Sequence, residues 1–359
     1  MRFLFIVQGE GRGHMTQAIS LSQMLRNANH EVCHVIVGKS PRRKIPAFFY
    51  DRIKSPVTEL ESPNFVTDKK NKSVKPLRSF VQSVLKTTNY QRSITAIGRI
   101  VKEKQPDGII NFYDFLGGLY NFYQRPKAKF ICIAHQYLMA HQDFQFPRGR
   151  NLDRTSLQVA NKITSFGADR ILALSFRPMA DAIKKKVYVV PPLIRQEVKD
   201  LPVSQRKSIL LYMVNPGYGE EVEKFHRTFP EVSLDCFWDM KDKPEVWKVD
   251  ETLTFHQLSD HKFLDKMSKC AGYITTAGFE SVCEAMYLGK PAMMIPVKGH
   301  YEQACNAIDA ENAGAGIGND SFDIRKLVDY IPKHQDTSSW FRPWANSNEK
   351  VFIEKLTRW

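Results

Sequence analysis

Several features that mark common protein classes are missing from this chain of 359 residues. It has no apolar run of about 18 residues that could span a membrane, and its opening, MRFLFIVQGEG, is too short and wrongly flanked for a signal peptide. Its six cysteines form no C-x-x-C pair and have no histidines at ligand spacing, so we expect reduced thiols and no zinc site. These absences predict a globular, cytoplasmic protein.

Acidic residues are too few to balance the basic ones. The chain has 52 lysines and arginines against 38 aspartates and glutamates, which gives a net charge of +14. Such an excess favours an acidic partner, and nucleic acid, an anionic membrane surface and phosphorylated substrates all qualify. The basic runs at 39–44, 69–78 and 184–186 lie in the first half, without any recognisable nucleic-acid module. We therefore expect no nucleic-acid partner, and a solvated surface is the alternative for each run.

Continuous apolar runs alternate with helical patterns, as is typical of buried parallel strands in α/β proteins. The first set of runs lies at 3–7, 31–37, 108–111, 129–134 and 170–175, with helices expected at 16–28, 77–104 and 153–166. The pattern restarts with runs at 187–193, 208–214, 233–239, 253–257, 272–276 and 291–296. Prolines and polar residues around 195–206 mark a hinge. The pattern predicts two doubly wound, Rossmann-like domains.

The first strand is followed by GEGRGHMTQA at residues 9–18. This stretch fails the dinucleotide fingerprint, because His14 stands in place of the third glycine, and it fails the P-loop pattern, because no lysine follows Gly13. What remains is a tight turn, with Gly11 and Gly13, that projects His14 from the start of a helix over the carboxyl edge of the sheet. That edge is where such folds bind ligands. A histidine satisfied within the loop is the alternative.

A second motif, ITTAGFESVCEAMYLGKPAMMIPVKGHYEQACNA, occupies residues 274–307. Gly278 permits a tight turn after a strand, and the helix that follows directs its free amides at an anion. Glu284 lies about one and a half turns into that helix, where a carboxylate can accept two hydrogen bonds from a ribose diol. Glu302 and Gln303 begin the next helix, from which they can reach sugar hydroxyls.

The combination resembles the donor-binding signature of glycosyltransferases with the GT-B fold, particularly the MurG-like and UDP-glycosyltransferase families. The matching positions are Gly278, Ser281, Glu284, Gly289-Lys290-Pro291, Glu302-Gln303 and Asn306-Ala307, together with the glycine loop that ends in His14. The resemblance implies two domains that face a cleft. Residues 1–195, rejoined by a terminal helix at 345–359, would bind the acceptor, and residues 205–344 would bind the nucleotide-sugar donor.

The resemblance also implies roles for single residues. Glu284 would hold the nucleotide ribose, Ser281 and the amides near Gly278 the diphosphate, and Glu302 with Gln303 the donor sugar. A second phosphate-facing turn would consist of Asn215, Pro216, Gly217, Tyr218 and Gly219, and the base would lie near His256 and Gln257. Thr276 departs from the pattern, because plant-type members carry histidine there. Its hydroxyl can replace that phosphate contact, or the donor preference can differ.

The expected chemistry needs neither a metal nor a cofactor. The sequence has no D-x-D pair, with which the other large transferase fold holds a metal on the diphosphate. A helix dipole and backbone amides would then stabilise the leaving group. Inversion at the anomeric carbon needs a base, and His14 suits this role because a helix N-terminus disfavours imidazolium. We expect Asp114, after the strand at 108–111, to orient His14 as a dyad. Capping of a helix at 115–120 is the alternative for Asp114.

The predicted function is therefore an inverting, metal-independent glycosyltransferase that moves a sugar from a UDP-linked or similar nucleotide donor to an acceptor hydroxyl. Two alternatives are a UDP-sugar 2-epimerase of the same fold and a non-catalytic basic protein that binds nucleic acid or another anion. The basic amphipathic segment 74–104 suits an anionic leaflet or a lipid-linked, anionic acceptor. It predicts peripheral contact with the inner face of the cytoplasmic membrane, against the alternative of a helix packed on the first domain.

Overall fold

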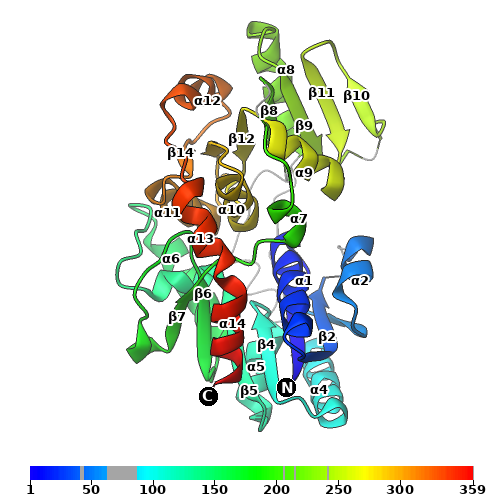
Figure 1. The fold of residues 1–359 in the computed structure, drawn as a ribbon. Coiled ribbons are helices and arrows are strands. Elements are labelled where there is room, and N and C mark those ends of the chain that lie inside the picture. Colours follow the sequence, from blue (N-terminus) through cyan, green and yellow to red (C-terminus); the bar gives the residue numbers. More distant parts are fainter. Residues whose placement is uncertain (41–43, 63–86, 205–206, 214–215, 241, 359) are drawn as a thin grey trace.

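The computed structural model describes residues 1–358 except 41–43, 63–86, 205–206, 214–215 and 241, and it consists of two α/β domains stacked end to end (Figure 1). The predicted donor residue Asn215 and most of the amino-terminal part of the predicted 77–104 helix lie outside the described residues. All six cysteines are free and buried.

The first domain is built on a parallel sheet with the strand order β3-β2-β1-β4-β5-β6-β7. Its strands are β1 (Arg2–Gln8), β2 (Glu31–Lys39), β3 (Val57–Glu61), β4 (Gly108–Phe112), β5 (Lys129–Ala134), β6 (Arg170–Leu174) and β7 (Val187–Val190). Helices cover both faces, which is why the central strands are continuous apolar runs. The helices are α1 (Arg12–Asn27), α2 (Ala47–Ile53), α4 (Thr87–Lys104), α5 (Phe115–Gln124), α6 (Asn151–Thr164) and the 3-10 helices η1 (His135–Ala140) and η2 (Ile183–Lys185).

The second domain repeats this plan, with the strand order β10-β11-β9-β8-β12-β13-β14 and one antiparallel pair, β10 with β11. Its strands are β8 (Ile209–Tyr212), β9 (Leu234–Trp238), β10 (Val246–Lys248), β11 (Leu253–Gln257), β12 (Gly272–Thr275), β13 (Ala292–Met294) and β14 (Gly316–Gly318). A short helix, α7 (Gln196–Lys199), lies in the linker. The other helices are η3 (Pro216–Tyr218), α8 (Gly219–Thr228), α9 (Asp260–Lys269), α10 (Phe279–Tyr287), α11 (Tyr301–Asn312), α12 (Ile324–Tyr330), η4 (Ile331–Lys333), α13 (Ser338–Asn346) and α14 (Asn348–Thr357).

Several strands differ from the sequence prediction. The run at 187–193, with which we expected the second set of strands to begin, forms β7 and pairs with β6 at the edge of the first sheet. We also did not predict the short strands β10 and β14, or β3. The sequence of β3, VTELE, lacks a continuous apolar run, and its side chains are half-buried except for the exposed Glu59.

The terminal helix crosses back to the first domain, as predicted. α13 packs on α10, whereas α14 (red in Figure 1) runs down beside the first domain and contacts α1 and β7. Phe352 and Leu356 are fully buried in the apolar core, and Val351 and Ile353 pack against it. Arg170 Nη1 donates to the Lys355 carbonyl at 2.5 Å. The last helix is thus part of the structure that joins the two domains.

The apolar face of α4 packs on the first domain. Tyr90, Ile94 and Ile97 are buried in the core together with residues of β1 and β4. In the part of the 74–104 segment that the structure describes, these side chains are therefore not available for insertion into lipid. No helix among the described residues combines the length and apolar character that are needed to cross a bilayer.

The strand order reverses between β1 and β4 in the first sheet and between β8 and β12 in the second. Ligands of open parallel sheets bind at such switch points, outside the carboxyl ends of the strands. β1 leads into the turn before His14, and β12 leads into the turn at Gly278. The fold therefore presents both predicted motifs at positions where ligands bind.

Candidate active site

The glycine turn after β1 places His14 in the first turn of α1. The Gly9 amide donates to the Gly38 carbonyl of β2 at 2.7 Å. A Cβ at Gly9 would lie 2.8 Å from that carbonyl oxygen, so this close approach requires glycine. Gly11 is the extended residue before α1, and the His14 side chain is buried, with 8% of its surface exposed.

His14 contacts three side chains of the first domain. Its Nδ1 lies 3.2 Å from Gln17 Oε1, and its Nε2 lies 3.5 Å from Gln136 Nε2. The ring also stacks on Tyr113, with centroids 5.7 Å apart. Because an amide oxygen can only accept, the hydrogen-bond network assigns the proton to Nδ1 and leaves Nε2 as the basic nitrogen. Burial lowers the pKa of His14 to about 4, so the ring is neutral at pH 7.

Two glutamates of the second domain complete this arrangement. Gln17 Nε2 donates to Glu280 Oε1 at 2.6 Å, and Gln136 Nε2 donates to Glu302 Oε1 at 2.9 Å. Glu280 lies in the first turn of α10 and Glu302 in the first turn of α11. The five side chains form one interdomain chain, in the order Glu280, Gln17, His14, Gln136 and Glu302.

Both glutamates are half-buried, and desolvation raises their pKa values, to about 8 for Glu280 and about 7 for Glu302. The amide donors Gln17 and Gln136 oppose these shifts. Each carboxyl can therefore exchange a proton near neutral pH. We predicted Glu302 from the sequence but not Glu280, although it stands two residues after Gly278 in the same motif.

Asp114 caps helix α5. Its Oδ1 accepts hydrogen bonds from the Leu116 amide at 2.8 Å and from Ser62 Oγ at 2.9 Å. Burial raises the pKa of its carboxyl to about 7. Within the described residues no hydrogen bond joins Asp114 to His14. The contacts of Asp114 are thus those of a helix-capping residue. The pairing of Asp114 with His14 stays a prediction.

Glu284, the predicted ribose ligand, is buried against an arginine of the linker. Arg195 Nε donates to Glu284 Oε1 at 2.7 Å, and Arg195 Nη1 donates to Asp260 Oδ1 at 2.5 Å. Burial raises the pKa of Glu284, and Arg195 opposes that shift. We did not predict Arg195. Its signal in the sequence is weak, because it is one cation among several in a polar hinge.

The turn between β12 and α10 carries the predicted phosphate ligands Thr276, Gly278 and Ser281. Ala277 adopts a left-handed backbone conformation with φ of 60°, which is strained for a residue with a Cβ. Asn306 Nδ2 donates to the Ala277 carbonyl at 3.1 Å and so holds the turn. Thr276 Oγ1 is buried and has no hydrogen-bond partner among the described residues. Ser281 Oγ donates to the Gly278 carbonyl at 3.2 Å. A phosphate contact would satisfy the Thr276 hydroxyl.

The other predicted donor residues have more local contacts. Tyr218 stacks on Phe322, with centroids 4.7 Å apart, and Gly219 begins α8 where a Cβ would lie 2.8 Å from the Trp238 ring. Gly217 lies in η3 beside them. In the same domain, Gln303 Oε1 accepts from the Val297 amide at 2.8 Å.

Two further predicted residues lie in or beside the second sheet. His256 Nε2 lies 3.1 Å from Asp235 Oδ1, on the neighbouring strand. The Gln257 amide accepts from the Met240 amide at 3.3 Å and donates to the Lys243 carbonyl at 3.0 Å. Both side chains therefore hold structure together, and their role at a nucleotide base stays a prediction.

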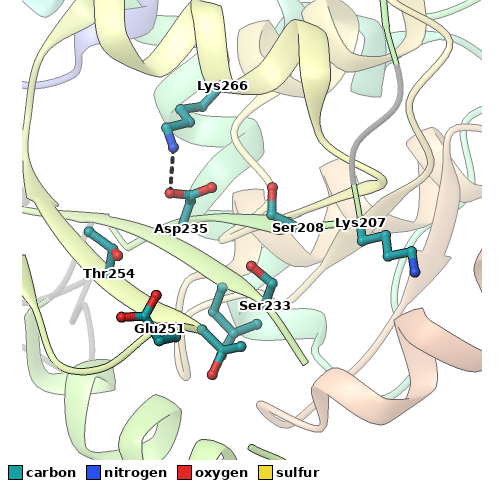
Figure 2. Close-up of a pocket in the computed structure, with 9 residues that line it drawn as sticks. Lys207, Ser208, Ser233, Asp235, Glu251, Thr254 and Lys266 are labelled. Atoms are coloured by element: carbon teal, nitrogen blue, oxygen red, sulfur yellow. Dashed lines mark hydrogen bonds and ion pairs between the residues drawn. The ribbon is translucent and has the colours of Figure 1, made fainter. Parts of the chain in front are cut away.

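A small cavity of about 320 Å³ lies elsewhere in the second domain. Figure 2 shows Ser208, Ser233 and Thr254 around it, with Lys266 paired to Asp235 at 2.8 Å. Ser208 and Ser233 directly precede β8 and β9, so this cavity lies at the amino ends of the strands. It is therefore at the edge of the sheet opposite to Gly278 and is separate from the predicted donor site.

A larger cavity, of about 950 Å³, lies in the first domain between η1, α6 and β7. Its wall combines apolar side chains with cations, and none of its described lining residues is acidic. The main ones are Tyr137, Met139, Phe144, Phe146, Ile171, Val187, Arg154, Lys162 and Lys185. Tyr137 packs edge-on against Tyr113 with centroids 5.4 Å apart, so one aromatic layer separates this wall from His14.

The described residues hold no group of three or more His, Cys, Asp or Glu side chains arranged for a metal ion. Metal independence stays a prediction.

Comparisons with known proteins identify the family and the fold. A family model described as glycosyl transferase family 1 matches residues 1–333. An uncharacterized glycosyltransferase of Methanosarcina acetivorans is 20% identical over 348 residues, which cover 88% of this chain and 85% of that protein. The Phytolacca americana UGT2 complex with UDP-2-fluoro-glucose and pterostilbene has a TM-score of 0.66 at 14% identity, over 98% of this chain and 96% of that one. MurG of Acinetobacter baumannii has a TM-score of 0.55 at 14% identity, over 100% and 99%.

The solved structures share the fold at low identity, whereas the family model covers nearly the whole chain. The chain therefore belongs to glycosyl transferase family 1 and is a glycosyltransferase with the GT-B fold.

Proposed function

We propose that this glycosyltransferase uses a UDP-sugar, inverts its anomeric centre and transfers the sugar to an acceptor hydroxyl without a metal ion. The observation that carries the proposal is the position of His14, whose Nδ1 lies 3.2 Å from Gln17 Oε1 and whose Nε2 lies 3.5 Å from the Gln136 amide that donates to Glu302 of the other domain. Only one amide group, that of Gln136, stands between the base and the predicted sugar ligand.

The reaction is a single displacement. The acceptor oxygen bonds to the anomeric carbon while its proton passes to His14 Nε2, and the bond between that carbon and the phosphate oxygen breaks. The nucleotide diphosphate leaves with the electron pair. The amides at the start of α10 and the unpaired Thr276 hydroxyl stabilise the charge that develops on it. For this step the acceptor hydroxyl replaces the Gln136 amide as the partner of His14.

The donor site follows from the same helix. Glu284 lies about one and a half turns into α10, and its carboxylate is proposed to accept hydrogen bonds from the ribose hydroxyls. The Phytolacca americana relative was solved with a UDP-sugar analogue. A thermal-shift panel of UDP, GDP, dTDP and CMP tests the base, and the account expects the largest stabilisation with UDP.

The acceptor is proposed to be an amphipathic molecule with an anionic group. The aromatic and cationic wall of the 950 Å³ cavity offers apolar contact and a positive field, and the rings of Tyr137 and Tyr113 link this wall to His14. Lys162→Glu should raise the KM for such an acceptor and leave UDP-sugar hydrolysis unchanged. An equal KM for an anionic acceptor in both proteins would remove this assignment.

Contact with the inner face of the cytoplasmic membrane is proposed to be electrostatic. The net charge of +14 attracts anionic lipid, while the described part of the basic segment keeps its apolar face inside the protein. Co-sedimentation with vesicles should need anionic lipid and fall as salt increases. Binding that is independent of both would contradict the proposal.

The reaction class is tested by product analysis. With a UDP-sugar and an accepted alcohol, NMR of the product should show an anomeric configuration opposite to that of the donor, with the same rate in the presence of EDTA. Retained configuration, or loss of transfer on chelation, would contradict the proposed mechanism.

A further inference from the structure

We propose that Gln17, itself fixed by Glu280 of the second domain, is the residue that orients His14, so that the base is set only when the two domains are closed. This inference rests on the proposed function, in which His14 is the base. In this inference Gln17 of the first domain and Glu280 of the second domain orient His14, a role that the sequence analysis predicted for Asp114.

The position of Gln17 follows from helix geometry. It stands three residues after His14 on α1, on the same face of the helix. Its side chain is buried, with 3% of its surface exposed, and its Oε1 is the partner of His14 Nδ1 at 3.2 Å. Accepting that proton fixes both the tautomer and the orientation of the ring.

An amide alone does not determine which tautomer results. If the Gln17 amide turned over, its nitrogen would face His14 and would donate to Nδ1, which would move the ring proton to Nε2 and destroy the base. Glu280 prevents this in its ionised form, because a carboxylate at 2.6 Å accepts from the Gln17 nitrogen and would repel its oxygen, and the hydrogen bond from Gln17 itself favours that form. The orientation of the amide, and with it the state of His14, is thus determined by Glu280.

Glu280 packs directly against the glycine turn of the first domain. A Cβ at Gly13 would lie 3.5 Å from Glu280 Cγ, which is an ordinary van der Waals distance. The domains also meet through aromatic rings next to Glu280. Phe279 stacks on His135 at 4.1 Å between centroids and contacts Phe176 at 4.5 Å. Opening of the cleft would separate these rings and withdraw Glu280 together with α10.

Asp114 is not placed to do this work. Its Oδ1 accepts from Ser62 and the Leu116 amide, and its Oδ2 points at Gly38, where a Cβ would lie 2.0 Å away. In the described part of the chain, the polar side chains that contact the imidazole are Gln17 and Gln136. When the cleft between the domains is open, Glu280 no longer fixes Gln17, and His14 is a poorer base. Water is then less readily activated to hydrolyse the donor.

The test reads the tautomer directly, without any substrate. Long-range ¹H–¹⁵N NMR of histidine-labelled protein, with the His14 signals identified by their loss in His14→Ala, should show Nδ1 protonated in the wild type. Gln17→Leu and Glu280→Leu should each shift the population toward the Nε2-protonated form. Glu280→Gln adds an amide donor for the Gln17 oxygen beside its acceptor oxygen, so it no longer selects one amide orientation and should also shift the population toward the Nε2-protonated form. Asp114→Asn should preserve the wild-type pattern.

Kinetics give a second readout. Gln17→Leu should lower kcat roughly 10- to 100-fold, below the loss of about 10⁴ when a charged partner of a catalytic histidine is removed, with little change in donor KM. Gln17→Met serves as the second variant if Gln17→Leu does not fold, as judged by its unfolding temperature. An unchanged tautomer in Gln17→Leu or Gln17→Met, or its loss in Asp114→Asn, would overturn the inference. If the tautomer responds as stated but no sugar is transferred by the wild type, the proposed function fails instead.

Discussion

Arg195 Nε lies 2.7 Å from Glu284 Oε1, so a cation of the interdomain linker is paired with the carboxylate that the sequence assigns to the ribose. Both side chains are buried, at 8% and 3% exposed surface. Arg195 also reaches Asp260 at the start of α9 and so joins the linker to two helices of the second domain. The predicted ribose ligand and the linker between the domains are therefore connected through one side chain.

Removal of Arg195 should be costly. Arg195→Met leaves the buried Glu284 carboxylate without its partner, which should lower the free energy of unfolding by about 3 to 5 kcal/mol. The double variant Arg195→Met with Glu284→Gln removes the uncompensated charge and should recover part of that loss. Urea unfolding of the wild type, Arg195→Met, Glu284→Gln and the double variant gives the coupling energy between the two side chains. Strictly additive losses would show that the two side chains do not interact in solution.

Glu284 should also determine nucleotide affinity. Glu284→Ala removes the acceptor of the ribose hydroxyls, and a lost hydrogen bond to a charged group costs about 1.5 to 3 kcal/mol of binding, or roughly 10- to 150-fold in Kd. Isothermal titration with UDP measures this change. The matched control is Glu251→Ala, which alters an exposed glutamate beside the cavity in Figure 2 and should leave the Kd unchanged. Equal affinity of Glu284→Ala and wild type would disprove the donor-site assignment.

Asp114 should make stability depend on pH. Its pKa is about 7 in the folded protein and 3.8 when unperturbed, so between these values the folded state binds more protons than the unfolded state. Stability from this group is therefore complete below pH 3.8 and is lost as pH rises toward 7, by roughly 4 kcal/mol in total.

The Asp114→Asn variant cannot ionise at that position. Its free energy of unfolding relative to wild type should therefore increase from pH 5 to pH 8, as measured by urea denaturation at both values. Ser62→Ala is a useful companion, because it removes one hydrogen bond to Asp114 without removing the carboxyl. A pH-independent difference between Asp114→Asn and wild type would mean that Asp114 titrates normally.

The sequence was most informative where a pattern is local. Apolar runs predicted the central strands, and the spacing from Gly278 to Glu302 placed the donor motif on α10 and α11. It was least informative about pairs from different domains. Nothing in the chain order relates Gln17 to Glu280, or Arg195 to Glu284, because these contacts exist only after two folded domains meet. Asp114 was ambiguous for a similar reason, since capping and catalysis favour the same residue type at the same position.

The most direct measurement of the central claim is UDP release from UDP-sugars by wild type and His14→Ala, in the presence of EDTA and an acceptor alcohol. The account predicts that His14→Ala lowers the rate roughly 10²- to 10⁴-fold, as expected for a positioned general base, and that its Kd for UDP is unchanged. A His14→Ala protein that binds UDP equally well and transfers sugar at the wild-type rate would contradict the account.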